Sequence, residues 1–205
     1  MAEYKKIVVG ELEVNCYLVY SKESKKCFIL DPGDESERII KIIRDIQLIP
    51  EAVILTHAHM DHCGGVSLIL SEFDIPLMMH EKELPVLRSD INKEFSAALG
   101  LSIPDAPDRY IAEGDEIGAD DLKIRVIHTP GHTPGSICLM TGNHLFTGDT
   151  LFAGSIGRTD LPGGDFSVIQ NSLEILKRFP PETFILPGHG DTTTLKQELE
   201  YNPFL

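Results

Sequence analysis

The chain of 205 residues has no tryptophan, only four cysteines and no long hydrophobic run. The cysteines form no CxxC pair and are too few to build a disulfide scaffold in a chain of this length. The longest uninterrupted apolar run, residues 16–20, is far shorter than the ~20 residues that cross a bilayer or the ~7 to 15 of a signal-peptide core. These absences predict a soluble, cytoplasmic protein with no membrane partner.

Positive charge is also scarce. The chain has 18 Lys and Arg against 32 Asp and Glu, a net charge of −14 and a pI near 4.9. Such a chain repels the phosphate backbone of nucleic acids, so we expect no nucleic-acid partner. No Ser- or Gly-rich linker and no repeat divides the sequence, which predicts a single domain over residues 1–205.

Short apolar runs alternate with amphipathic stretches along the chain. Strands are predicted over residues 6–10, 14–20, 26–30, 52–55, 75–79, 122–127, 136–140, 144–146 and 183–186. Helices are predicted over residues 39–46 with an end at Pro50, after residue 65, over 81–101, over 167–179 and from residue 194. Because hairpins occur beside strand–helix alternation, we expect mixed sheets covered by helices.

Three imidazoles and a carboxylate fall within six residues directly after the predicted strand 52–55, where the sequence reads THAHMDHCGG. In an extended chain His57 and His59 point the same way and can share one metal ion. A turn at Met60 can direct Asp61 and His62 to a second ion. A string of this density predicts a metal site.

Four ligands rarely complete two metal sites, so further ligands are expected just after other apolar strands. His132 lies in the loop after the strand 122–127, Asp149 follows residues 144–146, and His189 follows 183–186. The glycines and prolines in these loops allow close approach. We expect the four segments to meet at one end of the strands.

This ordered set of residues resembles the metallo-β-lactamase-fold hydrolases over nearly the whole chain. Within that superfamily it is most similar to a short, single-domain branch of the type II glyoxalases. The similarity includes GDTLF at 148–152, GRTD at 157–160, PGGD at 162–165 and NPFL at 202–205. The resemblance implies an α/β fold, an αββα sandwich of two mixed sheets flanked by helices, with metal ions at one edge of the sheets.

The resemblance also implies two divalent ions, with Zn²⁺ as the expected metal and Fe²⁺ or Mn²⁺ as alternatives. The first ion would be held by His57, His59 and His132, the second by Asp61, His62 and His189, and both by Asp149. Asp61 and Asp149 are therefore the carboxylates that we assign to the catalytic centre.

Other residues have two interpretations each. Asp31 either steadies the metal-binding loop from behind the ligands or has a plain turn role. Arg158 either binds a substrate carboxylate or forms a structural salt bridge. Cys63 either lines the metal loop or packs beneath the Gly-Gly turn. The remaining histidines, His80, His128 and His144, are not expected to be ligands.

The implied reaction is hydrolysis of a thioester or ester by a hydroxide shared between two ions, which lower the pKa of water to roughly 7. The expected partner is a small acyl-thioester such as S-lactoylglutathione, because a thiolate leaving group needs little protonation. Since only residues 191–205 follow Gly190, we expect no helical C-terminal domain of the kind that binds glutathione in longer type II glyoxalases. The di-zinc β-lactamases of this fold have Cys where this chain has Asp149, so β-lactam hydrolysis is not expected.

Two other functions stay open. Persulfide dioxygenases share the fold and a GRTD string, and use one Fe²⁺ held by two His and one Asp, a triad that His57, His132 and Asp149 could form. A third possibility is a metal-binding module without activity. The sequence carries no signature of oligomeric state.

Overall fold

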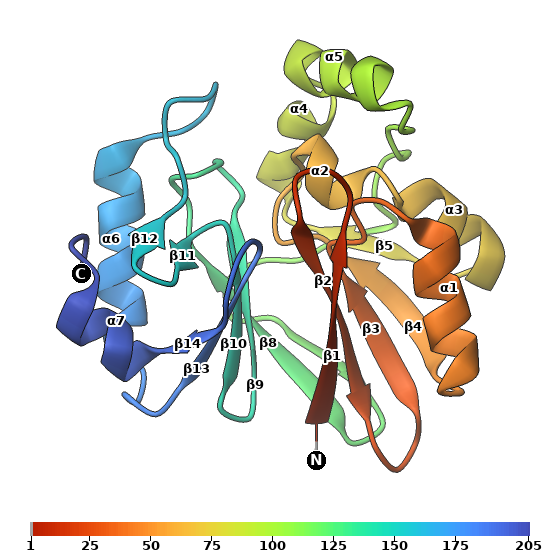
Figure 1. The fold of residues 1–205 in the computed structure, drawn as a ribbon, viewed down its shortest axis with the longest axis horizontal. Helices are drawn as coiled ribbons and strands as arrows, with labels where there is room; N and C mark the ends of the chain where they lie inside the picture. The colour runs from red at the N-terminus through yellow and green to blue at the C-terminus, as the bar shows by residue number, and fades with distance from the viewer. Residues whose placement is uncertain (1) are drawn as a thin grey trace.

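Two six-stranded sheets face each other in the computed structural model, which describes residues 2–205 (Figure 1). The first sheet has the order β1 (Ala2–Val9), β2 (Val14–Ser21), β3 (Lys26–Leu30), β4 (Ile49–Ile54), β5 (Leu77–Met79), β6 (Arg109–Tyr110). The second has the order β14 (Thr193–Thr194), β13 (Phe184–Pro187), β10 (His144–Gly148), β9 (Ile137–Thr141), β8 (Leu122–His128), β7 (Glu116–Ala119). A separate pair joins β11 (Leu151–Phe152) to β12 (Ser155–Ile156). Both large sheets mix parallel and antiparallel pairs, as predicted.

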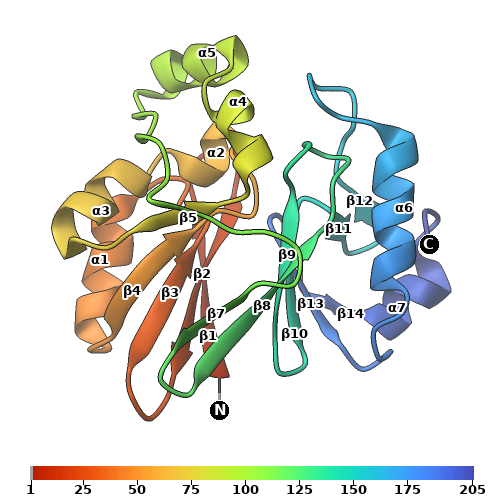
Figure 2. The same cartoon turned by 180° about the vertical axis from the view of Figure 1, so that it is seen from behind.

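Helices cover both outer faces of the sandwich, as the view from behind also shows (Figure 2). The first sheet is covered by α1 (Ser36–Asp45) and α3 (Val66–Phe73), and the second by α6 (Phe166–Leu176) and α7 (Leu195–Tyr201). The short elements α2 (Met60–Cys63), η1 (Glu81–Glu83), α4 (Leu84–Leu87) and α5 (Asp90–Leu99) lie toward one end of the first sheet. The predicted αββα architecture is confirmed. Within residues 2–205, no helix combines the length and apolarity needed to cross a membrane.

Apolar side chains fill each of the three interfaces between layers. Phe28, Ile54 and Phe146 belong to the cluster between the two sheets. Ile39 belongs to the cluster beneath α1 and α3, and Leu173 to the cluster beneath α6 and α7. This packing holds the strand ends of the two sheets in a fixed relation, and those ends carry the predicted ligands.

The helical conformation predicted over residues 81–101 is present, but not as one continuous helix. The segment is divided into η1, α4 and α5. Ser89 starts α5 anew, because its Oγ accepts a hydrogen bond from Asn92 N at 3.2 Å. Asn92 is turned inward and donates from Nδ2 to the Ala58 carbonyl oxygen at 2.6 Å. The break therefore packs α5 against the loop of residues 56–59, which carries two of the predicted ligands.

Several boundaries also differ from the prediction. Pro50 does not end a helix, because α1 already ends at Asp45, the chain turns at Gln47 with φ 58°, and Pro50 lies in β4. Strand β1 begins at Ala2 and not at residue 6. The strands β6, β7, β11, β12 and β14, of two to four residues each, were not predicted. The last helix begins as predicted, because Thr194 caps α7 by accepting a hydrogen bond at Oγ1 from Gln197 N.

Substitution of Phe146 tests how much the packing between the sheets contributes to stability. The Phe146 side chain is 1% exposed and its ring meets that of Tyr17 edge to face at 5.0 Å between centroids. We expect Phe146→Ala to lower the free energy of unfolding by about 3–5 kcal/mol in urea titrations, because a large cavity is left between the sheets. Phe166→Ala, at a side chain 49% exposed, should cost less than about 1 kcal/mol. Equal losses for the two variants would contradict this description of the core.

Candidate metal centre

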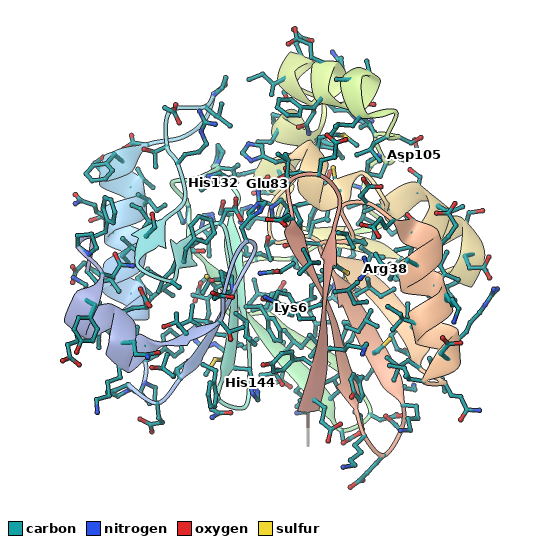
Figure 3. All side chains as sticks on the ribbon, in the orientation of Figure 1. Lys6, Arg38, Glu83, Asp105, His132 and His144 are labelled. Atoms are coloured by element: carbon teal, nitrogen blue, oxygen red, sulfur yellow. The ribbon has the colours of Figure 1, made fainter. Side chains whose placement is uncertain are left out.

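The predicted ligands lie in loops at one end of both sheets. His57 follows β4, His132 follows β8, Asp149 follows β10 and His189 follows β13. Strands β8, β10 and β13 run in the same direction, so their carboxyl ends reach the same edge. Figure 3 shows His132 at this end and His144 at the opposite end of the sheet. The expected meeting of the four segments is therefore present.

The seven predicted ligands converge into overlapping groups of possible metal ligands. Within each group the candidate ligand atoms lie within 4.8 Å of one another. The first group is His57, His59 and His132, the second is Asp61, His62 and His189, and the third is His57, His62 and Asp149. Asp149 lies between the first two groups, with Oδ1 3.4 Å from His62 Nε2 and Oδ2 3.7 Å from His132 Nε2.

A change of backbone direction in the metal-binding loop separates the ligands of the two groups. His59 is extended, with φ −67° and ψ 149°, and Met60 begins the four-residue helix α2 in place of the predicted turn. This helix brings Asp61 and His62 together with His189, while the His62 ring also lies beside that of His57, with 4.1 Å between centroids. Gly33 packs against the helix so closely that a Cβ there would lie 1.5 Å from the Asp61 carbonyl oxygen.

Asp31 fixes the orientation of His62 from behind the cluster. The Asp31 side chain is buried and accepts hydrogen bonds from Thr56 N at 2.7 Å and Thr56 Oγ1 at 2.6 Å. Its Oδ2 also accepts from His62 Nδ1 at 3.1 Å, which leaves His62 Nε2 facing the cluster. These contacts match the steadying role among the two predicted alternatives.

Backbone carbonyls orient two more imidazoles in the same way. His132 Nδ1 donates to the Arg158 carbonyl oxygen at 2.7 Å, and His189 Nδ1 donates to that of Leu12 at 3.0 Å. The Arg158 guanidinium forms two hydrogen bonds to Asp160, at 2.7 and 2.8 Å, so the predicted salt bridge is formed. Substrate binding by Arg158 stays a prediction.

Glu83 was missed by the sequence reasoning. Its carboxylate is fully buried and accepts from Ala58 N at 2.7 Å, Thr133 Oγ1 at 2.6 Å and Gly135 N at 2.8 Å. Burial raises the pKa of Glu83, and these three donors oppose the rise. The carboxylate thereby joins the two loops that carry the first group. One glutamate in a charged stretch gives no signal of this role in the sequence.

Burial and neighbouring charges set different protonation states within the cluster. Burial and the nearby His132 lower the pKa of His59 to about 3, so this ring is neutral at physiological pH. Burial alone would lower the pKa of His62, but the carboxylates of Asp149, Asp61 and Asp31 raise it to about 10. A metal ion that binds through His62 Nε2 must displace that proton.

The residues present fit a divalent ion. Imidazole nitrogens and carboxylate oxygens are ligands of Zn²⁺, Fe²⁺ and Mn²⁺. Asp149 Oδ1 is buried and accepts no hydrogen bond from any residue in the range 2–205. Gly188 leaves the space beside it open, since a Cβ there would lie 2.3 Å from this oxygen. A cation at this position would satisfy the oxygen.

The residues not expected to be ligands lie outside these groups within the described part of the chain. His80 and His128 stack on each other, with 4.3 Å between ring centroids and 5° between planes. His144 stacks on Phe184 at the far end of the sheet. Cys63 is fully buried, with Sγ 3.9 Å from the Ala58 carbonyl oxygen.

Comparison with known proteins covers nearly the whole chain. The profile of the Metallo-beta-lactamase superfamily matches residues 9–189. The hydroxyacylglutathione hydrolase GloC of Haemophilus influenzae is 36% identical and aligns with 97% of this chain and 96% of its own. The probable metallo-hydrolase YqgX of Bacillus subtilis is also 36% identical, over 99% and 97% of the two chains.

Solved structures show the same architecture. The B3 metallo-beta-lactamase BLEG-1 has a TM-score of 0.92 and 36% identity, over 99% of each chain. TTHA1623, solved in a di-iron-bound form, has a TM-score of 0.88 and 40% identity, over 98% of this chain and 100% of its own. ETHE1 from Myxococcus xanthus has a TM-score of 0.82 and 25% identity, over 98% and 83%.

The Asp31 network can be tested by one substitution. Asp31→Asn replaces one accepting oxygen with an NH₂ group, so one of the Thr56 or His62 contacts is lost. We expect affinity for Zn²⁺ to fall roughly 10- to 100-fold in competition with a chelator. Asp74→Asn is the matched control, because Asp74 also has positive φ, 52°, but is exposed. Unchanged affinity in Asp31→Asn would show that His62 does not depend on this carboxylate.

The proton on His62 makes metal binding pH-dependent. With a pKa of about 10 for His62, apparent Zn²⁺ affinity should rise by up to tenfold per pH unit between about pH 6 and pH 9, as the proton becomes easier to displace. Burial alone would also lower the pKa of His189, but the carboxylates of Asp61 and Asp149 raise it. Calorimetry in buffers of different ionisation enthalpy should therefore detect protons released from His62 and His189 on binding. An affinity independent of pH, after correction for the buffer, would contradict this protonation state.

Proposed function

The chain belongs to the metallo-beta-lactamase superfamily, and from this premise we propose that it is a binuclear metal-dependent hydrolase of S-lactoylglutathione or a related small acyl-thioester. The observation that carries the proposal is the position of Asp149 between two groups of ligands. The relative named hydroxyacylglutathione hydrolase supports the choice of a thioester. We further propose that the protein's partner is a small molecule, the acyl-thioester substrate, and that the protein acts in the cytoplasm.

Each group would hold one ion. The first ion would be bound by His57, His59 and His132, the second by Asp61, His62 and His189, and both by Asp149. When bound, the ions would supply water with a pKa lowered to roughly 7 and a Lewis acid for the carbonyl oxygen of the substrate. Zn²⁺ is the proposed metal, with Fe²⁺ and Mn²⁺ as alternatives.

The protein's own residues would orient the ligands and limit water around the reacting carbonyl. A cavity of about 360 Å³ lies against the cluster, with Leu12, Phe95 and Leu161 among its apolar lining residues. Arg158 lines the same cavity. Its exposed guanidinium is the group that would attract a carboxylate of the thiol portion, with Asp160 keeping it in place.

A persulfide dioxygenase with one Fe²⁺ is the second candidate. His57 Nε2 lies 3.3 Å from His132 Nε2, and Asp149 Oδ2 lies 3.7 Å from the same nitrogen, so His132 is near both other members of the proposed triad. The full second group favours the binuclear hydrolase, because a mononuclear site does not use Asp61, His62 and His189.

The first assay compares S-lactoylglutathione hydrolysis by metal-free protein and by protein loaded separately with Zn²⁺, Fe²⁺ and Mn²⁺. We expect turnover well above the metal-free control with at least one ion. Oxygen uptake with glutathione persulfide and Fe²⁺, without thioester hydrolysis, would favour the dioxygenase. A β-lactam belongs in the same assay because of the likeness to BLEG-1, and we expect it not to be hydrolysed efficiently.

Asp149→Asn tests the bridging role. Because Asp149 presents Oδ1 to His62 and Oδ2 to His132, the amide keeps an oxygen for only one of the two groups. We expect bound metal to fall to one ion or none and kcat/KM to fall by at least about 100-fold, more than after loss of a supporting residue behind the ligands. His144→Ala, at the opposite end of the same strand, should retain metal and activity. Two bound ions with full turnover in Asp149→Asn would overturn the assignment.

A further inference from the structure

A second cavity, of about 580 Å³, lies beside the metal centre. We call it the outer cavity, and the one of about 360 Å³ against the cluster the inner cavity. His59, Ile91 and Leu161 line both, so the two cavities adjoin. A substrate whose carbonyl group is at the metal centre can therefore extend past His59 into the outer cavity.

The outer cavity has predominantly apolar walls, which come from three separate parts of the chain. Pro85 and Val86 belong to α4 and Ile91 to α5. Pro134 follows the metal-binding His132, and Leu161 and Pro162 belong to the loop after Arg158.

The polar side chains at the outer cavity are largely engaged already. Ser89 Oγ accepts from Asn92 N, and the Asp90 carboxylate is paired with Lys93 at 2.8 Å. Lys82 is the one cation among the lining residues, and its side chain is on the exposed surface. A hydroxyl group placed against Pro85, Val86 and Leu161 would find no partner on these apolar side chains, whereas a hydrocarbon chain would lose water-exposed surface there.

We propose that the outer cavity binds an apolar acyl group, so that the preferred substrates are thioesters of small acyl groups with a longer hydrocarbon chain than lactoyl. This inference rests on the proposed thioesterase function and narrows it. The lactoyl group is small and carries a hydroxyl, so it neither fills the outer cavity nor matches its walls. A hydrocarbon chain gains about 0.8 kcal/mol per methylene moved from water to an apolar site.

The test uses the metal-loaded full chain and thioesters of the uncharged thiol N-acetylcysteamine. The acyl group is varied from acetyl through butyryl to hexanoyl. We expect kcat/KM to rise about fourfold per added methylene, the factor that corresponds to that transfer free energy. If kcat/KM stays constant or falls as the acyl chain lengthens, while S-lactoylglutathione is still hydrolysed, the inference is overturned and the proposed function stands.

A second series places the added methylenes on the thiol, as S-alkyl thioacetates. We expect little dependence on chain length here. A rise in this series but not in the acyl series would overturn the assignment of the outer cavity to the acyl group. If no thioester is hydrolysed with any of the three metals, the proposed function fails, and the inference fails with it.

A substitution in the outer cavity tests whether this cavity causes the dependence of kcat/KM on acyl chain length. Pro85 is exposed in the first turn of α4 and lines the outer but not the inner cavity. We expect Pro85→Glu to reduce the hexanoyl-to-acetyl ratio of kcat/KM by about tenfold or more while the acetyl rate and metal content stay unchanged. Pro162→Glu is the second variant if Pro85→Glu does not fold. Ile175→Glu is the matched control, because Ile175 lies on α6 and is 39% exposed. If the hexanoyl-to-acetyl ratio of kcat/KM is the same in all variants, the inference is overturned.

Discussion

The close approach of imidazoles and carboxylates in a buried place is the constraint on which the rest of this structure depends. Buried polar groups are costly unless each has a partner. Here the outward-facing ring nitrogens of His62, His132 and His189 are held by Asp31 and by two backbone carbonyls. The Nε2 atoms of the same three histidines face the centre of the cluster. There a shared proton or a bound cation is the partner that these neighbouring nitrogens lack. The αββα sandwich holds the loops that make this arrangement possible.

Backbone packing is as important as the ligands themselves. The chain passes so near the cluster at Gly157 and Gly188 that a Cβ would lie 1.8 Å from the Asp149 carbonyl oxygen or 2.3 Å from its Oδ1. Glu83 adds a different link, because it joins the loop of His57 and His59 to the loop of His132. Ligand positions are therefore set by contacts between loops from both sheets, and no single loop defines them.

Much of the architecture and the site could be predicted because both follow local patterns. Apolar strands that end in His or Asp indicated which residues meet, and the resemblance to a known fold ordered them into two groups. The division of residues 81–101 into three short helices and the role of Glu83 could not be found in this way. The role of Glu83 depends on contacts with Ala58 and Thr133, which lie 25 and 50 residues away in the sequence. The inward turn of Asn92 at the start of α5 depends on its contact with Ala58, which lies 34 residues away. The strands β11 and β12 have two residues each, too few for a periodic pattern.

The distribution of ligands along the chain also bears on biosynthesis. The first group is complete once His132 has been made, but the second also requires His189. His57, His59, Asp61 and His62 follow β4 of the first sheet, whereas His132, Asp149 and His189 follow β8, β10 and β13 of the second. On the ribosome, the second group therefore cannot form until β13 has been synthesised and has paired with β10. Loading of the second group and closure of the second sheet thus become linked events in the maturation of the protein.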